Sequence, residues 1–230
     1  MGKIEENVHL APFNTMGVKV KARYFVEVHS VDELIEAIIF SEENSLPFLV
    51  LGGGSNLLFK SDFSGLVILN RISGIQNIQE DEHHVTIKIG AGENWHEFVI
   101  HCVEQGFGGI ENLSLIPGTV GAAPIQNIGA YGVELKDVFK SLEALDIETK
   151  EVKSFQKNEC KFGYRDSVFK KELKGKTIIT SVSLQLSKDA QPNFEYQSLK
   201  DNLAEKGINS PTIKEVSDAV IEVRKSKLPD

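Results

Sequence analysis

The sequence is poor in features that mark several classes of protein. It has two cysteines in 230 residues, Cys102 and Cys160, which is too few for a disulfide framework. No uninterrupted apolar run approaches the roughly 20 residues that span a bilayer. The opening residues Met1–Glu6 are charged and lack the apolar stretch of a signal peptide. We therefore expect a cytoplasmic protein that is not inserted in a membrane.

Basic charge is also scarce. Lys and Arg number 25 against 33 Asp and Glu, for a net charge of −8, which argues against general binding to nucleic acid. His83, His84 and His96 have no companion ligands at metal-binding spacing, so we expect no metal site. Hydrophobic residues make up 41% of the chain, and this length suits one large domain or two small ones.

Glycine is concentrated in two segments. The run from Ile116 to Glu134 holds Gly118, Gly121, Gly129 and Gly132 among small and apolar residues, and an earlier loop follows the apolar run 47–51. Glycine lets a backbone turn at positive φ and approach a ligand closely. Two such loops in one small chain favour a large phosphorylated cofactor, although glycines that merely make tight turns remain the alternative.

The apolar patterning predicts an α/β layer up to about Asn70. Ser30 is the expected N-cap of a helix over 31–39, with Glu33 completing a capping box. The short apolar runs 47–51 and 66–69 predict buried strands on either side of the first glycine loop.

Beyond this layer the pattern predicts a second, largely antiparallel sheet. A hairpin over 75–89 and a helix from Trp95 to a stop at Gly106 precede the long glycine run. Further strands are expected over 141–147, 151–155 and 177–186. A last helix is expected to begin with Ser210 as its cap and Pro211 at its first position.

With the glycine loops placed, the chain resembles the UDP-N-acetylenolpyruvoylglucosamine reductase family. The motifs that carry the resemblance run in the family's order through the whole chain: Asn14–Gly17, Leu51–Phe59, Gly90–His96, Glu111–Glu134, Phe162–Phe169 and Lys225–Asp230. Tyr196, in the segment Phe194–Gln197, suits the subgroup with an extra tyrosine loop.

The resemblance implies an α+β fold, the FAD-binding fold of the vanillyl-alcohol-oxidase type. Two α/β subdomains, residues 1–72 and 73–190, would hold FAD between them, and residues 191–230 would form the tyrosine loop and the start of a substrate domain that is otherwise missing. Asn56 stands where relatives with covalent flavin place a histidine, so we expect FAD to bind without a covalent bond. The residues expected at the FAD are Gly52, Gly53, Gly54, Ser55, Asn56, Leu57, Pro117, Gly118, Val120, Gly121, Ala122, Ala123, Gln126, Asn127, Gly129 and Ala130.

The family reaction implied by the resemblance reduces the enolpyruvyl double bond of UDP-N-acetylglucosamine enolpyruvate to give UDP-N-acetylmuramate, with NADPH as co-substrate, in peptidoglycan precursor synthesis. Arg165 matches the family's catalytic arginine, whose guanidinium stabilises the charge that develops on the substrate carboxylate. The alternative is a surface Arg165 paired with Asp166. Tyr131, Tyr196, Arg224 and Lys227 are the expected substrate-binding residues, and solvated polar side chains are the alternative for the last three.

The match ends before the family's proton-donating serine and its later glutamate, so the chain is expected to bind FAD but to turn over slowly or not at all. A flavin-binding module without turnover and a related FAD-linked oxidase are the alternative functions. We expect a monomer for the complete protein.

Overall fold

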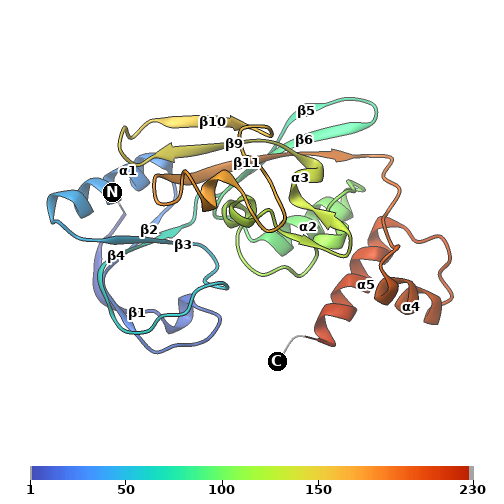
Figure 1. Cartoon of the computed structure of the whole chain (residues 1–230), viewed down its shortest axis with the longest axis horizontal. Helices are drawn as coiled ribbons and strands as arrows, with labels where there is room; N and C mark the ends of the chain where they lie inside the picture. Colours follow the sequence, from blue (N-terminus) through green and yellow to red (C-terminus); the bar gives the residue numbers. More distant parts are fainter. Residues whose placement is uncertain (1, 228–230) are drawn as a thin grey trace.

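Two β-sheets form the framework of the molecule in a computed structural model that describes residues 2–227 (Figure 1). In the first sheet the strand order is β1-β2-β4-β3, with β1 antiparallel to β2 and the other pairs parallel. Its strands are β1 (Glu5–His9), β2 (Lys21–Val28), β3 (Phe48–Leu51) and β4 (Phe63–Asn70). The predicted strands at 47–51 and 66–69 are thus confirmed.

Helix α1 (Val31–Glu43) covers one face of this sheet. The Ser30 side chain accepts a hydrogen bond from the Glu33 amide, which confirms the predicted N-cap. The Glu33 carboxylate returns to the amide of His29, one residue earlier than in a standard capping box. Leu34 and Ile38 are fully buried in a cluster that also takes in Leu145 and Ile178 of the second sheet, so this core joins the two sheets.

The second sheet is antiparallel throughout, with strand order β10-β9-β11-β6-β5. Its strands are β5 (Ile75–Glu80), β6 (His84–Gly90), β9 (Phe139–Asp146), β10 (Val152–Gln156) and β11 (Thr177–Ser187). The predicted hairpin and the three later strands are confirmed. The subdomain boundary proposed at residue 72 falls between the two sheets.

Helix α2 (Trp95–Glu104) packs against the second sheet through the apolar face that the sequence predicted. Trp95 is almost fully buried and donates its indole N–H to the Leu113 carbonyl at 2.9 Å. Gly106 follows the helix with φ of +78°, a conformation that suits glycine at a helix end. Val120, Ala123 and Ile128 of the long glycine run pack into the same core.

Short elements connect the framework. They are η1 (Ala11–Phe13), η2 (Glu111–Leu113), η3 (Val120–Gln126), β7 (Gly129–Ala130), β8 (Val133–Glu134), α3 (Leu135–Val138) and η4 (Val168–Lys170).

Two helices, α4 (Gln197–Glu205) and α5 (Ile213–Lys225), pack on each other at one end of the molecule (Figure 1). Helix α4 has no counterpart among the elements expected from the sequence, and the predicted start of α5 is wrong. Thr212, not Ser210, is the N-cap, and it forms a capping box with Glu215. The reciprocal hydrogen bonds of Thr212 and Glu215, three residues apart, fix the start of the helix at this point. Pro211 lies outside the helix.

No helix within residues 2–227 is both long enough and apolar enough to cross a membrane.

Candidate functional site

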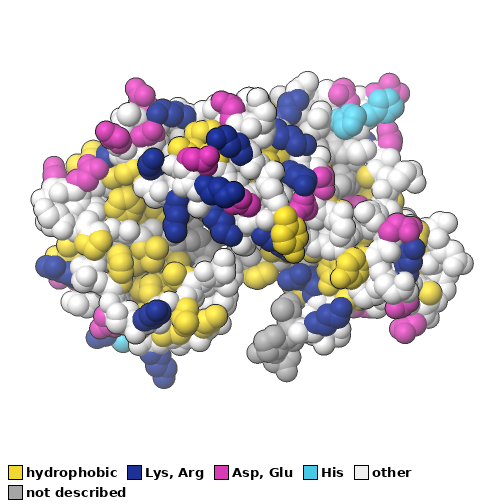
Figure 2. Space-filling model, viewed as in Figure 1, with side chains coloured by type: hydrophobic (Ala, Val, Ile, Leu, Met, Phe, Trp, Pro, Cys, Tyr) yellow, Lys and Arg dark blue, Asp and Glu magenta, His cyan; other side chains and the backbone are white. Residues whose placement is uncertain are grey.

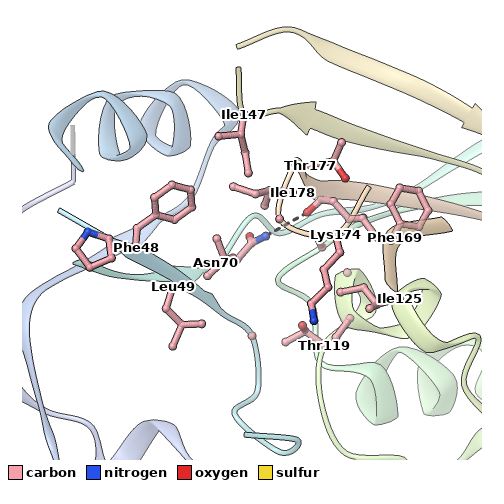
Figure 3. Close-up of a pocket in the computed structure, with 18 of the residues that line it drawn as sticks. Phe48, Leu49, Asn70, Thr119, Ile125, Ile147, Phe169, Lys174, Thr177 and Ile178 are labelled. Atoms are coloured by element: carbon pink, nitrogen blue, oxygen red, sulfur yellow. Dashed lines mark hydrogen bonds between the residues drawn. The ribbon is translucent and has the colours of Figure 1, made fainter. Parts of the chain in front are cut away.

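A cavity of about 690 Å³ lies between the two sheets (Figure 3). One wall is β3 with the residues that flank it, including Pro47, Phe48 and Gly52. The other wall comes from β11, from the residue after β9 and from η3, and its side chains include Ile147 and Ile178. The walls are mostly apolar, and the volume lies in the range of sites that bind small molecules and cofactors.

The two glycine loops contact each other at this cavity. A Cβ on Gly53 would lie 2.8 Å from the Cα of Gly118, and a Cβ on Gly52 would lie 2.5 Å from Oγ1 of Thr119. Both distances are too short for a real contact, so Gly53 allows backbone to pack on backbone and Gly52 leaves room for the Thr119 side chain. Gly118 itself has φ of +116°. These glycines therefore do more than make turns, because they let the two loops pack closely on each other.

The first glycine loop presents main-chain N–H groups that have no acceptor. Among residues 2–227, nothing accepts a hydrogen bond from the amides of residues 53–57. Gly54, at φ of +63°, turns the loop, and its carbonyl accepts from Thr15 at 3.3 Å. Successive amides around a left-handed residue form a concavity that attracts anions. The loop thus fits the diphosphate of a dinucleotide.

The second glycine run is hydrogen-bonded to the segment that contains Arg165. Asn127 is buried, and its amide group donates to the Gly163 carbonyl at 2.9 Å and accepts from the Lys136 amide at 3.0 Å. Ser167 donates to the Ile125 carbonyl at 2.7 Å. The Asn127 side chain is therefore engaged within the protein, which leaves any contact of this residue with a cofactor to its main chain.

Arg165 points to the same glycine run. Its Nη2 donates to the Gly129 carbonyl at 2.5 Å, and its φ of +53° places it in the left-handed region. Asp166 pairs with Lys171 instead, and that hydrogen bond is the main reason why the pKa of Asp166 lies below its usual value. The surface pair of Arg165 with Asp166 is therefore not formed, and the exposed guanidinium stays beside the loop.

Three of the four expected substrate residues come together at the neighbouring hairpin. The rings of Tyr131 and Tyr196 lie perpendicular to each other with centroids 5.3 Å apart. Burial raises the pKa of Tyr131, and the nearby positive charge of Arg224 opposes this shift. The Arg224 Nε donates to the Leu115 carbonyl at 3.2 Å. Lys227 is exposed just beyond α5, and residues 228–230 of its motif lie outside the described residues.

Two residues near the site had no role assigned from the sequence. Asn112 is fully buried and donates to the carbonyls of Tyr131 at 3.0 Å and Asn193 at 2.7 Å. It therefore fixes the tyrosine loop to the hairpin. Asn70 donates to the Ile179 carbonyl at 3.4 Å across the cavity wall (Figure 3). Asn70 follows an apolar run and Asn112 lies inside a motif. The spacing of apolar residues does not indicate the hydrogen-bond partners of either side chain.

Comparisons with known proteins decide the family. The profile of an FAD binding domain matches residues 22–154. A UDP-N-acetylenolpyruvoylglucosamine reductase of Amoebophilus asiaticus is 51% identical over 229 residues, which cover 99% of this chain and 67% of the relative. The chain belongs to this reductase family. It spans about two thirds of the length of the curated relatives that it matches.

Solved structures confirm the fold. A UDP-N-acetylenolpyruvylglucosamine reductase from Thermus caldophilus superposes with a TM-score of 0.69 at 24% identity, covering 100% of this chain and 72% of the other. A 6-hydroxy-D-nicotine oxidase from Arthrobacter nicotinovorans gives 0.60 at 16% identity, covering 81% and 42%. The reductase-family chain thus has the expected α+β FAD-binding fold of the vanillyl-alcohol-oxidase type, and the expectation of FAD is confirmed by the domain match.

Proposed function

We propose that this chain binds FAD non-covalently in the cavity between its sheets and serves the NADPH-dependent reduction of UDP-N-acetylglucosamine enolpyruvate to UDP-N-acetylmuramate. The observation that carries the proposal is the row of unpaired amides at residues 53–57 in a reductase-family chain. This row begins where Gly52 and Gly53 pack against Thr119 and Gly118 at the edge of the cavity. When bound, FAD supplies the hydride transfer between NADPH and the substrate double bond.

The residues that would hold FAD divide by the chemistry of its parts. The amides of residues 53–57 suit the diphosphate. The apolar walls around Phe48 and Ile178 suit a flat ring. Ala122 and Gly121 also line the cavity, and their small size would let the second loop approach the cofactor closely.

Arg165 would act on the substrate carboxylate. Hydride addition to the enolpyruvyl group pushes negative charge into that carboxylate, and a fixed cation stabilises charge that develops only toward the transition state. A guanidinium is always protonated and donates two parallel hydrogen bonds to a carboxylate, which an ammonium cannot copy. The bond from Arg165 to the Gly129 carbonyl orients the group at the glycine run.

Tyr131, Tyr196, Arg224 and Lys227 would bind the UDP-sugar. The two tyrosine rings pack edge to face beside the Arg224 side chain, which gives hydroxyl donors and positive charge in one place for phosphate oxygens. Lys227 follows α5 and adds a further cation. The proposal includes a cytoplasmic monomer, and the two free, buried cysteines support a reducing compartment.

A single-turnover experiment tests the function. The chain is loaded with FAD, reduced with NADPH under anaerobic conditions and mixed with the enolpyruvyl UDP-sugar while the flavin absorbance is followed. We expect the sugar to restore the oxidised spectrum slowly, in keeping with the slow turnover expected from the sequence. Arg165→Lys should slow this return by about 10²-fold or more, the usual scale for removing one donor to a developing anion, with FAD affinity unchanged.

The same experiment defines the contrary results. A flavin that binds but stays reduced in the presence of the sugar would contradict a reductase role for this chain and would favour a flavin-binding module. Equal rates in the wild type and in Arg165→Lys would remove the role proposed for Arg165.

A further inference from the structure

The segment between β10 and β11 is rich in lysine, and Figure 2 shows basic side chains gathered over this part of the molecule. Three of these lysines have partners. Lys161 pairs with Glu172 and Lys171 pairs with Asp166, while Lys170 donates to the Arg165 carbonyl at 3.1 Å. Within residues 2–227, the side chains of Lys157, Lys174 and Lys176 have no hydrogen bond or ion pair.

Of these three unpaired lysines, Lys174 lines the cavity, and Lys157 and Lys176 do not. A tight turn sets its position: the Lys174 amide donates to the Lys171 carbonyl, the Lys176 amide donates to the Leu173 carbonyl, and Gly175 lies at φ of +72°. Figure 3 shows the Lys174 side chain extending into the cavity toward Thr119. The turn therefore projects a cation from the second sheet across to the glycine loops.

The surroundings of Lys174 are suited to an anion. It is the one charged side chain among the described residues that line the cavity, since the others are apolar, hydroxyl-bearing or amide residues and glycines. Thr119, toward which it extends, is the residue that a Cβ on Gly52 would strike. The ammonium thus points toward Thr119, where the two glycine loops meet, and Gly52 at the start of the first loop lines the same cavity.

We propose that Lys174 binds the diphosphate of the dinucleotide from the side opposite the first glycine loop. The Lys174 side chain is exposed at the cavity and has no carboxylate partner, so its ammonium is free to make a charge-assisted hydrogen bond to a ligand that carries negative charge. The amides of the loop fix the position of the diphosphate, and Lys174 adds the only formal charge that offsets it within the cavity. The inference rests on the proposed FAD site and names a further binding residue in it.

Titration of the apoprotein with FAD tests the role of Lys174, with the Kd read from the change in flavin fluorescence. At low ionic strength we expect Lys174→Ala and Lys174→Gln to raise the Kd by roughly tenfold, the scale of one charge-assisted hydrogen bond. The wild-type Kd should rise with added salt more steeply than that of either variant, because salt screens the contact that they lack. Lys174→Arg should keep most of the affinity.

Lys176→Ala is the matched control, since it removes the same charge from the same turn outside the cavity. Its Kd and its salt dependence should equal those of the wild type. Equal effects of Lys174→Ala and Lys176→Ala, or no effect of either on Kd, would overturn the inference while leaving the FAD site standing. A wild type that binds no FAD would overturn the proposed function as well.

Discussion

At the scale of single residues, Gly53 and Gly118 bring the backbones of the two glycine loops into close contact near the proposed cofactor site. The partner of an added Cβ is backbone rather than a flexible side chain, so the loops would have to separate to admit it. Gly163 offers the opposite case, because an added Cβ would meet only ordinary contacts from 3.6 Å outward. The two positions form a natural pair of test and control.

We predict that Gly53→Ala destabilises the protein by about 1–3 kcal/mol, the usual cost of forcing atoms into a packed site, and weakens FAD binding at least tenfold. Gly163→Ala should leave the FAD affinity near that of the wild type. Urea denaturation and FAD titration measure the two effects. An unchanged FAD affinity in Gly53→Ala would show that the loop junction does not form the site.

The residue scale also shows what motifs reveal and what they do not. The glycines and Arg165 could be proposed as site residues from the sequence, because their motifs are specific. Lys174 carries no motif, and its proposed role depends on a turn that places it at the cavity. Asn127 was identified as a residue of the glycine run, but its bonds to Gly163 and Lys136 depend on tertiary structure.

At the scale of elements, the start of α5 offers two candidate N-caps, Ser210 from the sequence and Thr212 from the structure. Thr212 accepts from the Glu215 amide, and the Glu215 carboxylate accepts from the Thr212 amide at 2.8 Å. We predict that Thr212→Ala costs about 1 kcal/mol of stability, the typical value for loss of an N-cap, whereas Ser210→Ala changes stability by less than about 0.5 kcal/mol. Urea denaturation of the two variants compares them, and a larger loss in Ser210→Ala would contradict the assigned cap.

The β9–β10 turn gives a prediction about pH. Asp146 accepts hydrogen bonds from Lys153 and from the amides of Thr149 and Glu148, and these lower its pKa from 3.8 to about 2. A carboxylate with a depressed pKa contributes stability that is full above its unfolded pKa and is lost as the pH falls through the folded one. Asp146→Asn should therefore be less stable than the wild type above about pH 5.

That difference should shrink as the pH is lowered from about 5 toward 3, because the wild type then loses the contribution of the carboxylate. Thermal melts of the wild type and Asp146→Asn across this range measure it. A difference that stays constant with pH would mean that the Asp146 charge does not stabilise the turn.

The elements with strong periodicity were predictable, and α4 shows why others were not. Helices α1 and α2 have apolar faces that the sequence displays at the expected spacing. Helix α4 has only two buried apolar side chains, Leu199 and Leu203, in a polar stretch. Its stability comes from packing on Val216 and Val220 of α5, a contact that local sequence cannot indicate.

At the scale of the whole molecule, two sheets of different construction enclose one cavity. The residue pattern predicted a small α/β layer followed by an antiparallel sheet, and the structure confirms both. The way in which they face each other was implied by the family resemblance alone, because the contacts that fix it join distant segments. Leu145 and Ile178 pack into the α1 core, and Asn70 bonds to Ile179 across the sheets.

In the proposed complex, FAD lies between the sheets with its diphosphate at the junction of the glycine loops. A crystal structure of the chain with FAD would test this arrangement. We predict FAD in the cavity, with no covalent bond, and diphosphate oxygens within hydrogen-bonding distance of the amides of residues 53–57. FAD bound elsewhere on the chain, or a diphosphate remote from those amides, would contradict it.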